Sequence, residues 1–239
     1  MELIGGGRAS QVFALDERTV LRRSGFDVSG EVRLMRHLRA AGFPVPEVFA
    51  SDGGDLTMRR LYGGTLGAEV TAGRIGVPEA AQLLLDLHDR LHTIDAPDWL
   101  PTARRGLDLA GLDLADPDRV GPGPAKVLHL DLHPENVIVT DGGPYLVDWT
   151  NAAAGAPELD LAVSWAILAG IDLSTSGTDF DWLEAVRGDL LAVFSERVAP
   201  DALALAVAYR EADPNVDPVE AQRLRRALPT GLRLSARVG

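Results

Sequence analysis

Apolar and polar residues repeat with two different periods along the chain, and the change of period divides it into two parts. In the first part, short apolar runs between turns predict strands at 19–23, 47–51 and 56–59. One helical pattern lies among them, from Ser29 to Ala41, and Gly42 follows it as a helix-ending residue. The first part therefore predicts a small β-rich lobe with one helix.

The second part is mainly helical and begins after Leu61-Tyr62-Gly63-Gly64, a segment typical of a hinge. A helix that opens at Pro78 carries apolar residues on one face: Ala80, Leu84, Leu87, His88, Leu91 and Ile94. Further helices are predicted over 157–170, 179–197, 201–211 and 219–234. The fold class is therefore α+β, with a β-rich N-lobe at 1–62 and a larger helical C-lobe at 63–239.

One stretch interrupts the helical part with a β-hairpin that carries polar residues at its ends. A strand at 126–128 leads into the loop 129–136, after which strands at 137–139 and 145–147 flank the turn Asp141-Gly142-Gly143. The pattern places Asp131 and Asn136 before the hairpin and Asp148 directly after it. We therefore expect two acids and one amide to converge.

These three residues match the requirements of phosphoryl transfer. That chemistry needs an Asp that orients the attacking hydroxyl, and an Asn and an Asp that hold Mg²⁺ beside the phosphates. Asp131 and Asn136 are five residues apart, which is the spacing of the kinase catalytic loop. The stretch predicts Asp131 as the catalytic base and Asn136 and Asp148 as metal ligands.

Composition and charge narrow the classes of molecule that the protein is expected to bind. The 239 residues carry a net charge of −12, which argues against nucleic acid and favours a cationic small molecule. The absence of cysteine excludes disulfides and fits a cytoplasmic protein. No apolar stretch approaches the length of a membrane span, and no signal peptide pattern opens the chain. The sequence does not indicate an oligomeric state.

Candidate phosphate contacts precede the hinge. Gly5, Gly7 and Ser10 lie in a glycine segment whose backbone can approach phosphates, although such a run is as often only a turn. Arg22, on a predicted strand, can contact phosphate oxygens and pair with Glu31 on the following helix. The simpler alternatives are an exposed strand-end arginine and a solvated glutamate.

Two histidine patterns raise the question of a metal site. His88 and His92 resemble the H-E-x-x-H pattern of zinc proteases with Asp in place of Glu, and His129, Asp131 and His133 alternate. We favour packed helix histidines for the first pattern and a catalytic loop for the second. A metal hydrolase would leave Asp148 and the glycine segment unused, and no G-x-S-x-G elbow is present.

Two further groups of acids have open interpretations. Asp160 begins a helix that otherwise appears buried, so it either accepts backbone N–H groups of the catalytic loop or complements the helix dipole. A segment rich in Pro, Gly and Asp spans 97–124, and its acids suggest either a solvated loop or an acidic wall of the acceptor pocket. Those acids are Asp108, Asp113, Asp116 and Asp118.

The chain resembles the aminoglycoside phosphotransferase and choline kinase-like family, small-molecule kinases with a protein-kinase-like fold. The family loop H-G-D-x-H-P-x-N matches His129, Asp131, His133, Pro134 and Asn136. The later family patterns match Val147-Asp148-Trp149 and Asp160-Leu161-Ala162. The resemblance extends over roughly 5–170, is specific over 129–162 and is weak in the glycine segment.

The resemblance implies a role for each candidate. Asp131 would be the base, and Asn136 and Asp148 would bind Mg²⁺. The residues implied at the ATP or GTP site are Gly5, Gly7, Ser10, Arg22, Glu31 and the hinge residues Met58 and Leu61. His129 and Asp160 would support the catalytic loop. The acceptor would be a hydroxyl of a small molecule.

Two departures from the family pattern leave alternatives open. Leu130 replaces the usual Gly and changes the space beside the base, and Arg22 replaces the usual Lys. The chain is also short for the family, which implies a small acceptor lobe. The acceptor could instead be choline-like, thiamine-like, sugar or homoserine-like, or the protein could bind a nucleotide with little or no transfer activity.

Overall fold

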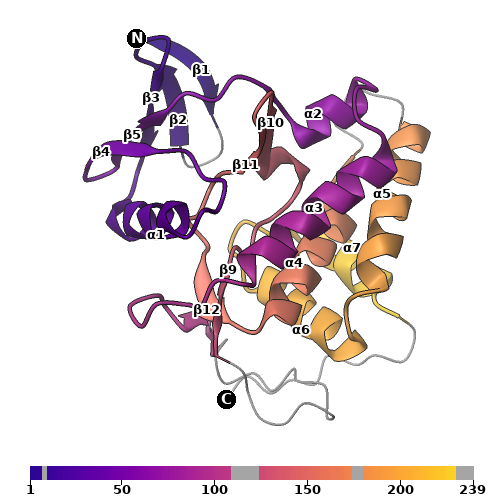
Figure 1. Ribbon diagram of the computed structural model, residues 1–239. Helices are drawn as coiled ribbons and strands as arrows, with labels where there is room; N and C mark the ends of the chain where they lie inside the picture. Colours follow the sequence, from indigo (N-terminus) through magenta and orange to yellow (C-terminus); the bar gives the residue numbers. More distant parts are fainter. Residues whose placement is uncertain (7–9, 109–123, 174–179, 230–239) are drawn as a thin grey trace. The chain divides into compact units, whose positions relative to one another are not determined.

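The computed structural model describes residues 1–6, 10–108, 124–173 and 180–229. These residues divide into two compact units, one within Met1–Ala72 and Pro134–Thr150 and the other within Gly73–His133 and Asn151–Gly239. The α+β class predicted from the sequence is confirmed, with an antiparallel sheet in the N-terminal part and helices in the C-terminal part. Figure 1 shows the elements of each unit.

The first unit is built on a five-stranded antiparallel sheet in the order β1-β2-β3-β5-β4. Its strands are β1 (Glu2–Gly6), β2 (Ser10–Ala14), β3 (Thr19–Ser24), β4 (Val48–Asp52) and β5 (Asp55–Arg59). Helix α1 (Ser29–Ala40) lies beside β4 and buries Val32, Leu34, Met35 and Leu38 (Figure 1). These apolar residues recur at helical spacing, and burying each stabilises the unit by roughly 1.5–3 kcal/mol.

A second, three-stranded sheet completes the first unit. It has the order β11-β10-β6 and consists of β6 (Gly64–Thr65), β10 (Val137–Thr140) and β11 (Gly143–Leu146). The helix α2 (Leu66–Thr71) and the short 3-10 helix η1 (Pro134–Asn136) pack beside it. The backbone N–H of Leu146 also donates to the carbonyl of Pro44 at 2.9 Å. The hairpin of β10 and β11 therefore belongs to the first unit.

This grouping differs from the predicted division at residues 62 and 63. Residues 63–72 and 134–150 belong to the unit of the N-terminal sheet, because β6 pairs with β10 and β11 is bonded to Pro44. Gly63 permits the close approach of β6, since a Cβ there would lie 1.7 Å from the carbonyl oxygen of Val139. Pairing between segments distant in sequence cannot be read from local periodicity.

The second unit is mainly helical. Its helices are α3 (Val77–Leu91), α4 (Pro157–Gly170), α5 (Phe180–Ser195), α6 (Pro200–Glu211) and α7 (Pro218–Ala227). Helix α4 is buried from Leu159 to Gly170 and packs against α5, α6 and α7, while α3 packs against α5. A helix that is apolar on all sides is expected at the centre of such a bundle.

Short strands accompany the helices of the second unit. Strand β9 (Lys126–Leu128) pairs with β12 (Ala153–Gly155), and β7 (Ala103–Arg104) pairs with β8 (Leu107–Asp108). The segment predicted as a loop over 97–124 thus contains a small hairpin, and Asp108 ends it. Asp113, Asp116 and Asp118 lie outside the described residues.

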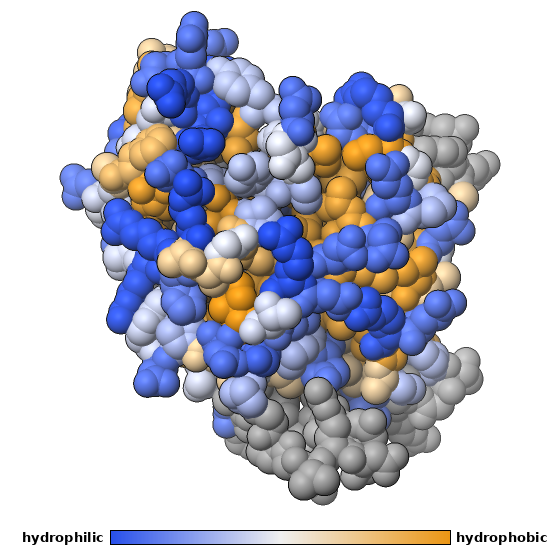
Figure 2. Space-filling view, in the orientation of Figure 1, coloured by the Kyte–Doolittle hydropathy of each residue, from blue (hydrophilic) through white to orange (hydrophobic). Residues whose placement is uncertain are grey.

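Polar side chains cover most of the surface visible in Figure 2, and apolar residues show between them over the helical unit. Among the described residues, no helix combines the length and the apolar character that a membrane crossing requires.

Candidate active site

The hairpin of the first unit brings Asn136 and Asp148 to the same end. Val137 pairs with Leu146 in the antiparallel register, and Asn136 and Val147 extend this pair outward. The backbone N–H of Val147 donates to the carbonyl of Asn136 at 2.9 Å. Both Asn136 and Asp148 are half-buried. An amide oxygen and a carboxylate at the same end of one hairpin offer oxygen ligands of the kind that Mg²⁺ prefers.

Asp148 has a backbone conformation that is rare for a residue other than glycine. Its φ is +63°, in the left-handed region, and such residues concentrate at functional sites. The hydroxyl of Thr150 donates to Oδ1 of Asp148 at 2.9 Å. The neighbouring Trp149 anchors the segment, because its buried ring packs edge-on against Phe43 and its indole N–H donates to the carbonyl of Leu146 at 3.2 Å.

Arg22 and Glu31 form a buried ion pair in the same unit. Arg22 lies on β3 between β2 and β5, and both Nη atoms donate to the carboxylate of Glu31 on α1. Only 7% of Arg22 and 8% of Glu31 is exposed. The predicted alternatives, an exposed arginine and a solvated glutamate, are therefore wrong. Oε1 of Glu31 also accepts the backbone N–H of Trp149 at 3.3 Å.

The remaining nucleotide-site candidates lie on or beside the five-stranded sheet. Gly5 on β1 pairs with Val12, and Ser10 begins β2, so the glycine segment connects two antiparallel strands. Gly7 lies outside the described residues. Met58 lies on β5, and Leu61 follows that strand. Both are half-buried.

Asp131 lies in the second unit, on the loop that follows β9. Its backbone N–H donates to Nδ1 of the buried His129 at 3.2 Å, which shapes the loop between them. Leu130 is fully buried and has a φ of +60°. The sequence indicated that a leucine in place of glycine would change the space beside the base. The structure shows in addition that this position needs a left-handed backbone, which glycine adopts without strain.

The side chain of Asp160, in the first turn of α4, holds this loop by accepting hydrogen bonds from the loop backbone. Its Oδ1 accepts the N–H of Leu130 at 2.7 Å, and its Oδ2 accepts the N–H of His129 at 3.1 Å. The side chain of Asp160 is fully buried. Of the two interpretations left open by the sequence, the hydrogen bonds to the loop are thus present, and Asp160 also lies at the N-terminal end of its helix.

Two histidines, His88 in α3 and His92 at the C-cap of this helix, complete the surroundings of Asp160. Nε2 of His92 lies 3.0 Å from Oδ2 of Asp160, and Nδ1 of His88 lies 3.5 Å from the same atom. Burial alone would raise the pKa of Asp160, but His88 and His92 outweigh it and hold this pKa well below its usual value of 3.8. The carboxylate is therefore ionised and can only accept hydrogen bonds, so Nε2 of His92 carries the proton.

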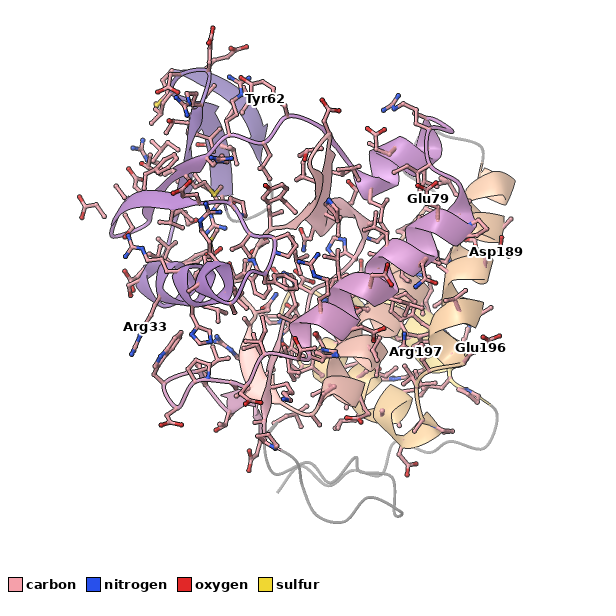
Figure 3. The ribbon with its side chains drawn as sticks, viewed as in Figure 1. Arg33, Tyr62, Glu79, Asp189, Glu196 and Arg197 are labelled. Atoms are coloured by element: carbon pink, nitrogen blue, oxygen red, sulfur yellow. The ribbon has the colours of Figure 1, made fainter. Side chains whose placement is uncertain are left out.

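Sequence reasoning did not connect these histidines with Asp160. The signal for the connection was the i, i+4 spacing of His88 and His92, which places both side chains on one face of α3. One ring nitrogen from each of His88 and His92 and a carboxylate oxygen of Asp160, atoms that could bind a metal ion, lie within 4.8 Å of one another. Asp89, at the position of the protease glutamate, instead pairs at 2.6 Å with Arg197, which is labelled in Figure 3.

The predicted site residues thus form two groups. The first unit holds the nucleotide and metal candidates, and the backbone bond between Glu31 and Trp149 ties Arg22 to the segment of Asp148. The second unit holds Asp131 and its supports His129 and Asp160. The chain passes between the units at Ala72–Gly73, at His133–Pro134 and at Thr150–Asn151.

Comparisons with known proteins identify the family and the fold. The model of the phosphotransferase enzyme family matches residues 1–205. The structure of aminoglycoside phosphotransferase APH(4)-Ia has a TM-score of 0.62 at 17% identity, over 97% of this chain and 93% of that chain. A choline/ethanolamine kinase family protein from Mesorhizobium loti has a TM-score of 0.58 at 20% identity, over 94% and 85%.

A third neighbour is APH(2")-IIa, described as a ternary complex with streptomycin and ATP. Its TM-score is 0.54 at 15% identity, over 87% of this chain and 81% of that chain. No curated protein sequence is similar enough to this chain to be matched. The predicted protein-kinase-like fold and the predicted family resemblance are both confirmed.

Proposed function

The chain belongs to the phosphotransferase enzyme family, and we propose that it moves the γ-phosphate of ATP or GTP to a hydroxyl of a small molecule. One observation carries the proposal. Glu31 accepts both the guanidinium of Arg22 and the backbone N–H of Trp149, so the candidate phosphate contact and the metal-ligand segment are held by one carboxylate. Buried charge arranged in this way serves a site that must hold a triphosphate in a fixed position.

In the proposed reaction, the acceptor hydroxyl oxygen attacks the γ-phosphorus in line with the leaving group. The bond from this oxygen to phosphorus forms as the bond from phosphorus to the β–γ bridging oxygen breaks, and the nucleoside diphosphate leaves with the electron pair. The carboxylate of Asp131 orients the hydroxyl and receives its proton. Asp131 can be aimed for this task because the loop before it is bonded to Asp160.

Asn136 and Asp148 fit a Mg²⁺ ion by their chemistry and placement. Both offer oxygen ligands, both are half-buried, and they extend from the same end of one hairpin. When bound, Mg²⁺ neutralises negative charge on the phosphate oxygens. The left-handed backbone of Asp148 and the anchored ring of Trp149 fix the direction of this carboxylate before any ligand arrives.

Arg22 can contact phosphate while it remains paired with Glu31. A guanidinium has five N–H donors, and the two bonds to Glu31 leave further donors on the same nitrogens. This supports an active site with arginine at the position where the family usually has lysine. The alternative of a nucleotide-binding protein with little transfer activity rests on the same substitution, and activity measurements separate the two.

The acceptor is proposed only by class. The structural neighbours include an enzyme described with streptomycin and a choline/ethanolamine kinase family protein, and both support a hydroxyl-bearing, cationic acceptor. The net charge of −12 favours the same class. Sugar, thiamine-like and homoserine-like acceptors belong in the same test.

Two experiments test the proposal. Melting temperature is first measured with ATP and with GTP, each with and without Mg²⁺, and a nucleotide-binding site predicts a shift that Mg²⁺ increases. Nucleotide turnover is then measured against a panel of aminoglycosides, amino alcohols and sugars. Release of nucleoside diphosphate that depends on one acceptor class supports the kinase. A magnesium-dependent shift without turnover on any acceptor supports the binding protein instead.

A further inference from the structure

Asp160 accepts more hydrogen bonds than an interaction with the dipole of its own helix would explain. Two backbone N–H groups of the catalytic loop, from His129 and Leu130, donate to it at 3.1 and 2.7 Å. Nε2 of His92 adds a third donor at 3.0 Å. All of these groups belong to the second unit. Helix α3 therefore contacts the same carboxylate that shapes the loop before Asp131.

The loop depends on this carboxylate because of Leu130. Its left-handed backbone costs a residue other than glycine roughly 1–2 kcal/mol. The bond from its N–H to Oδ1 of Asp160, at 2.7 Å, fixes the His129–Leu130 peptide, one residue before Asp131, and offsets this cost. If Oδ1 or Oδ2 were protonated or turned away, one loop N–H would lose its acceptor.

His92 keeps Asp160 in the state that the loop needs. A fully buried carboxylate must be compensated, or it becomes protonated. Its bond to Nε2 of His92 favours the ionised form and also fixes the rotation of the carboxylate plane. The neighbouring His88 is itself held in place, since its Nε2 bonds the hydroxyl of Ser164 at 3.0 Å and its ring packs edge-on against Phe194.

We propose that His92 is a positioning residue for phosphoryl transfer, acting through Asp160 on the backbone at Leu130 and so on the direction of Asp131. The proposal rests on the catalytic role proposed for Asp131. It assigns a function to the second histidine of the α3 pattern, which otherwise resembles part of a metal site. His92 would contact neither nucleotide nor acceptor.

The surroundings of His92 allow this role to be tested by substitution. The side chain of His92 is 9% exposed and lines a cavity of about 310 Å³, whereas His88 is completely enclosed. Asp89 and Arg197 line the same cavity and pair with each other through two hydrogen bonds. A smaller or longer side chain at 92 can therefore be accommodated, and Asp89 offers a control on the same helix.

The test compares His92→Ala, His92→Gln and the control Asp89→Ala in acceptor-dependent turnover. Loss of the loop geometry predicts that His92→Ala lowers kcat about 100-fold with little change in KM for ATP. His92→Gln keeps an N–H donor near the position of Nε2 and is expected to stay within about tenfold of the parent. Asp89→Ala is expected to leave kcat unchanged.

A double-mutant cycle with Asp160→Asn shows whether His92 acts through Asp160. In the Asp160→Asn background, His92→Ala is expected to cause less than about a threefold further loss. An equal loss in both backgrounds, or equal losses in His92→Ala and His92→Gln, would overturn the proposal. Stabilisation by Zn²⁺ that disappears in His92→Gln would also overturn it, because the same atoms would then serve as metal ligands.

Amide hydrogen exchange makes this test independent of the proposed function. The N–H groups of His129 and Leu130 are expected to exchange faster in His92→Ala than in the parent or in Asp89→Ala. Unchanged exchange at both amides would contradict the proposal. If the parent protein transfers phosphate to no acceptor, the proposed function fails, while the exchange rates still decide whether His92 holds the loop.

Discussion

Oε1 of Glu31 accepts the backbone N–H of Trp149 at 3.3 Å, a bond between residues 118 positions apart. The same carboxylate holds both Nη atoms of Arg22. A helix residue thereby connects the central strand of the sheet with the segment that carries Asp148. The side chains proposed for the nucleotide site in the first unit are consequently organised around one buried ion pair.

Glu31→Gln is expected to weaken both stability and turnover. The substitution keeps the size of the side chain but leaves the guanidinium of Arg22 buried without its counter-charge, which costs on the order of 3 kcal/mol. Urea unfolding measures the loss. Arg23→Gln is the control, since Arg23 pairs with Asp55 on the exposed side of the same strand and should change stability little. Equal losses in both variants would contradict the role of the buried pair.

Asp148→Asn is expected to abolish transfer while the fold is kept. An amide cannot neutralise Mg²⁺ as a carboxylate does, so turnover should fall at least about 1,000-fold. Asp141→Asn is the matched control, because Asp141 lies exposed in the turn of the same hairpin. Turnover at several Mg²⁺ concentrations provides the measurement. Similar turnover in the two variants would exclude Asp148 as a ligand.

Gly63→Ala is expected to destabilise the protein by about 3 kcal/mol, because the added Cβ would collide with the carbonyl oxygen of Val139. Gly188→Ala is the control, since Gly188 lies within α5 and a Cβ there meets no atom within 4 Å. That variant should gain roughly 0.5–1 kcal/mol. Melting temperatures of the two variants should therefore move in opposite directions. A Gly63→Ala protein as stable as the parent would mean that β6 does not approach β10 so closely.

Stability is expected to fall as the pH falls below about 6.5, in part because of His88. Burial lowers the pKa of His88 below its usual value of 6.5, although Asp160 raises it in part. The unfolded chain therefore takes up a proton over a pH range in which folded His88 does not, and acid favours unfolding. The low pKa of Asp160 adds a loss only at more acidic pH.

Urea unfolding at several pH values between about 7.5 and 5.5 measures this effect. His88→Gln removes the titrating group while keeping a side chain that can bond Ser164. The variant should be less stable at neutral pH and should show a smaller change in stability with pH. An unchanged pH dependence would contradict the assignment of neutral His88 in the folded protein.

Local patterns in the sequence predicted most helices and strands, because the residues that each element buries recur at a regular spacing along the chain. The helix α4 was predicted over its full range from apolar residues and Pro157, and the strands of the hairpin were predicted from their turn residues. The spacing of Asp131, Asn136 and Asp148 was visible for the same reason. Each of these features lies within one short stretch of chain.

Relationships between distant segments were not predicted. The pairing of β6 with β10 moves residues 63–72 into the unit of the sheet, and it depends on Gly63, whose local sequence only suggests a hinge. The contact of His92 with Asp160 joins residues 68 positions apart. Leucine does not favour the left-handed backbone found at Leu130. The carboxylate of Asp160, which accepts the N–H of Leu130, stabilises this conformation.

The most direct test of the account is transfer of the γ-phosphate from labelled ATP to an acceptor, measured for the parent and for Asp131→Asn. Asp131 is assigned to orient the acceptor hydroxyl, and an amide cannot receive its proton. The account predicts labelled acceptor from the parent and at least about a 1,000-fold lower rate from Asp131→Asn, with the same melting temperature. Full transfer by Asp131→Asn would contradict it.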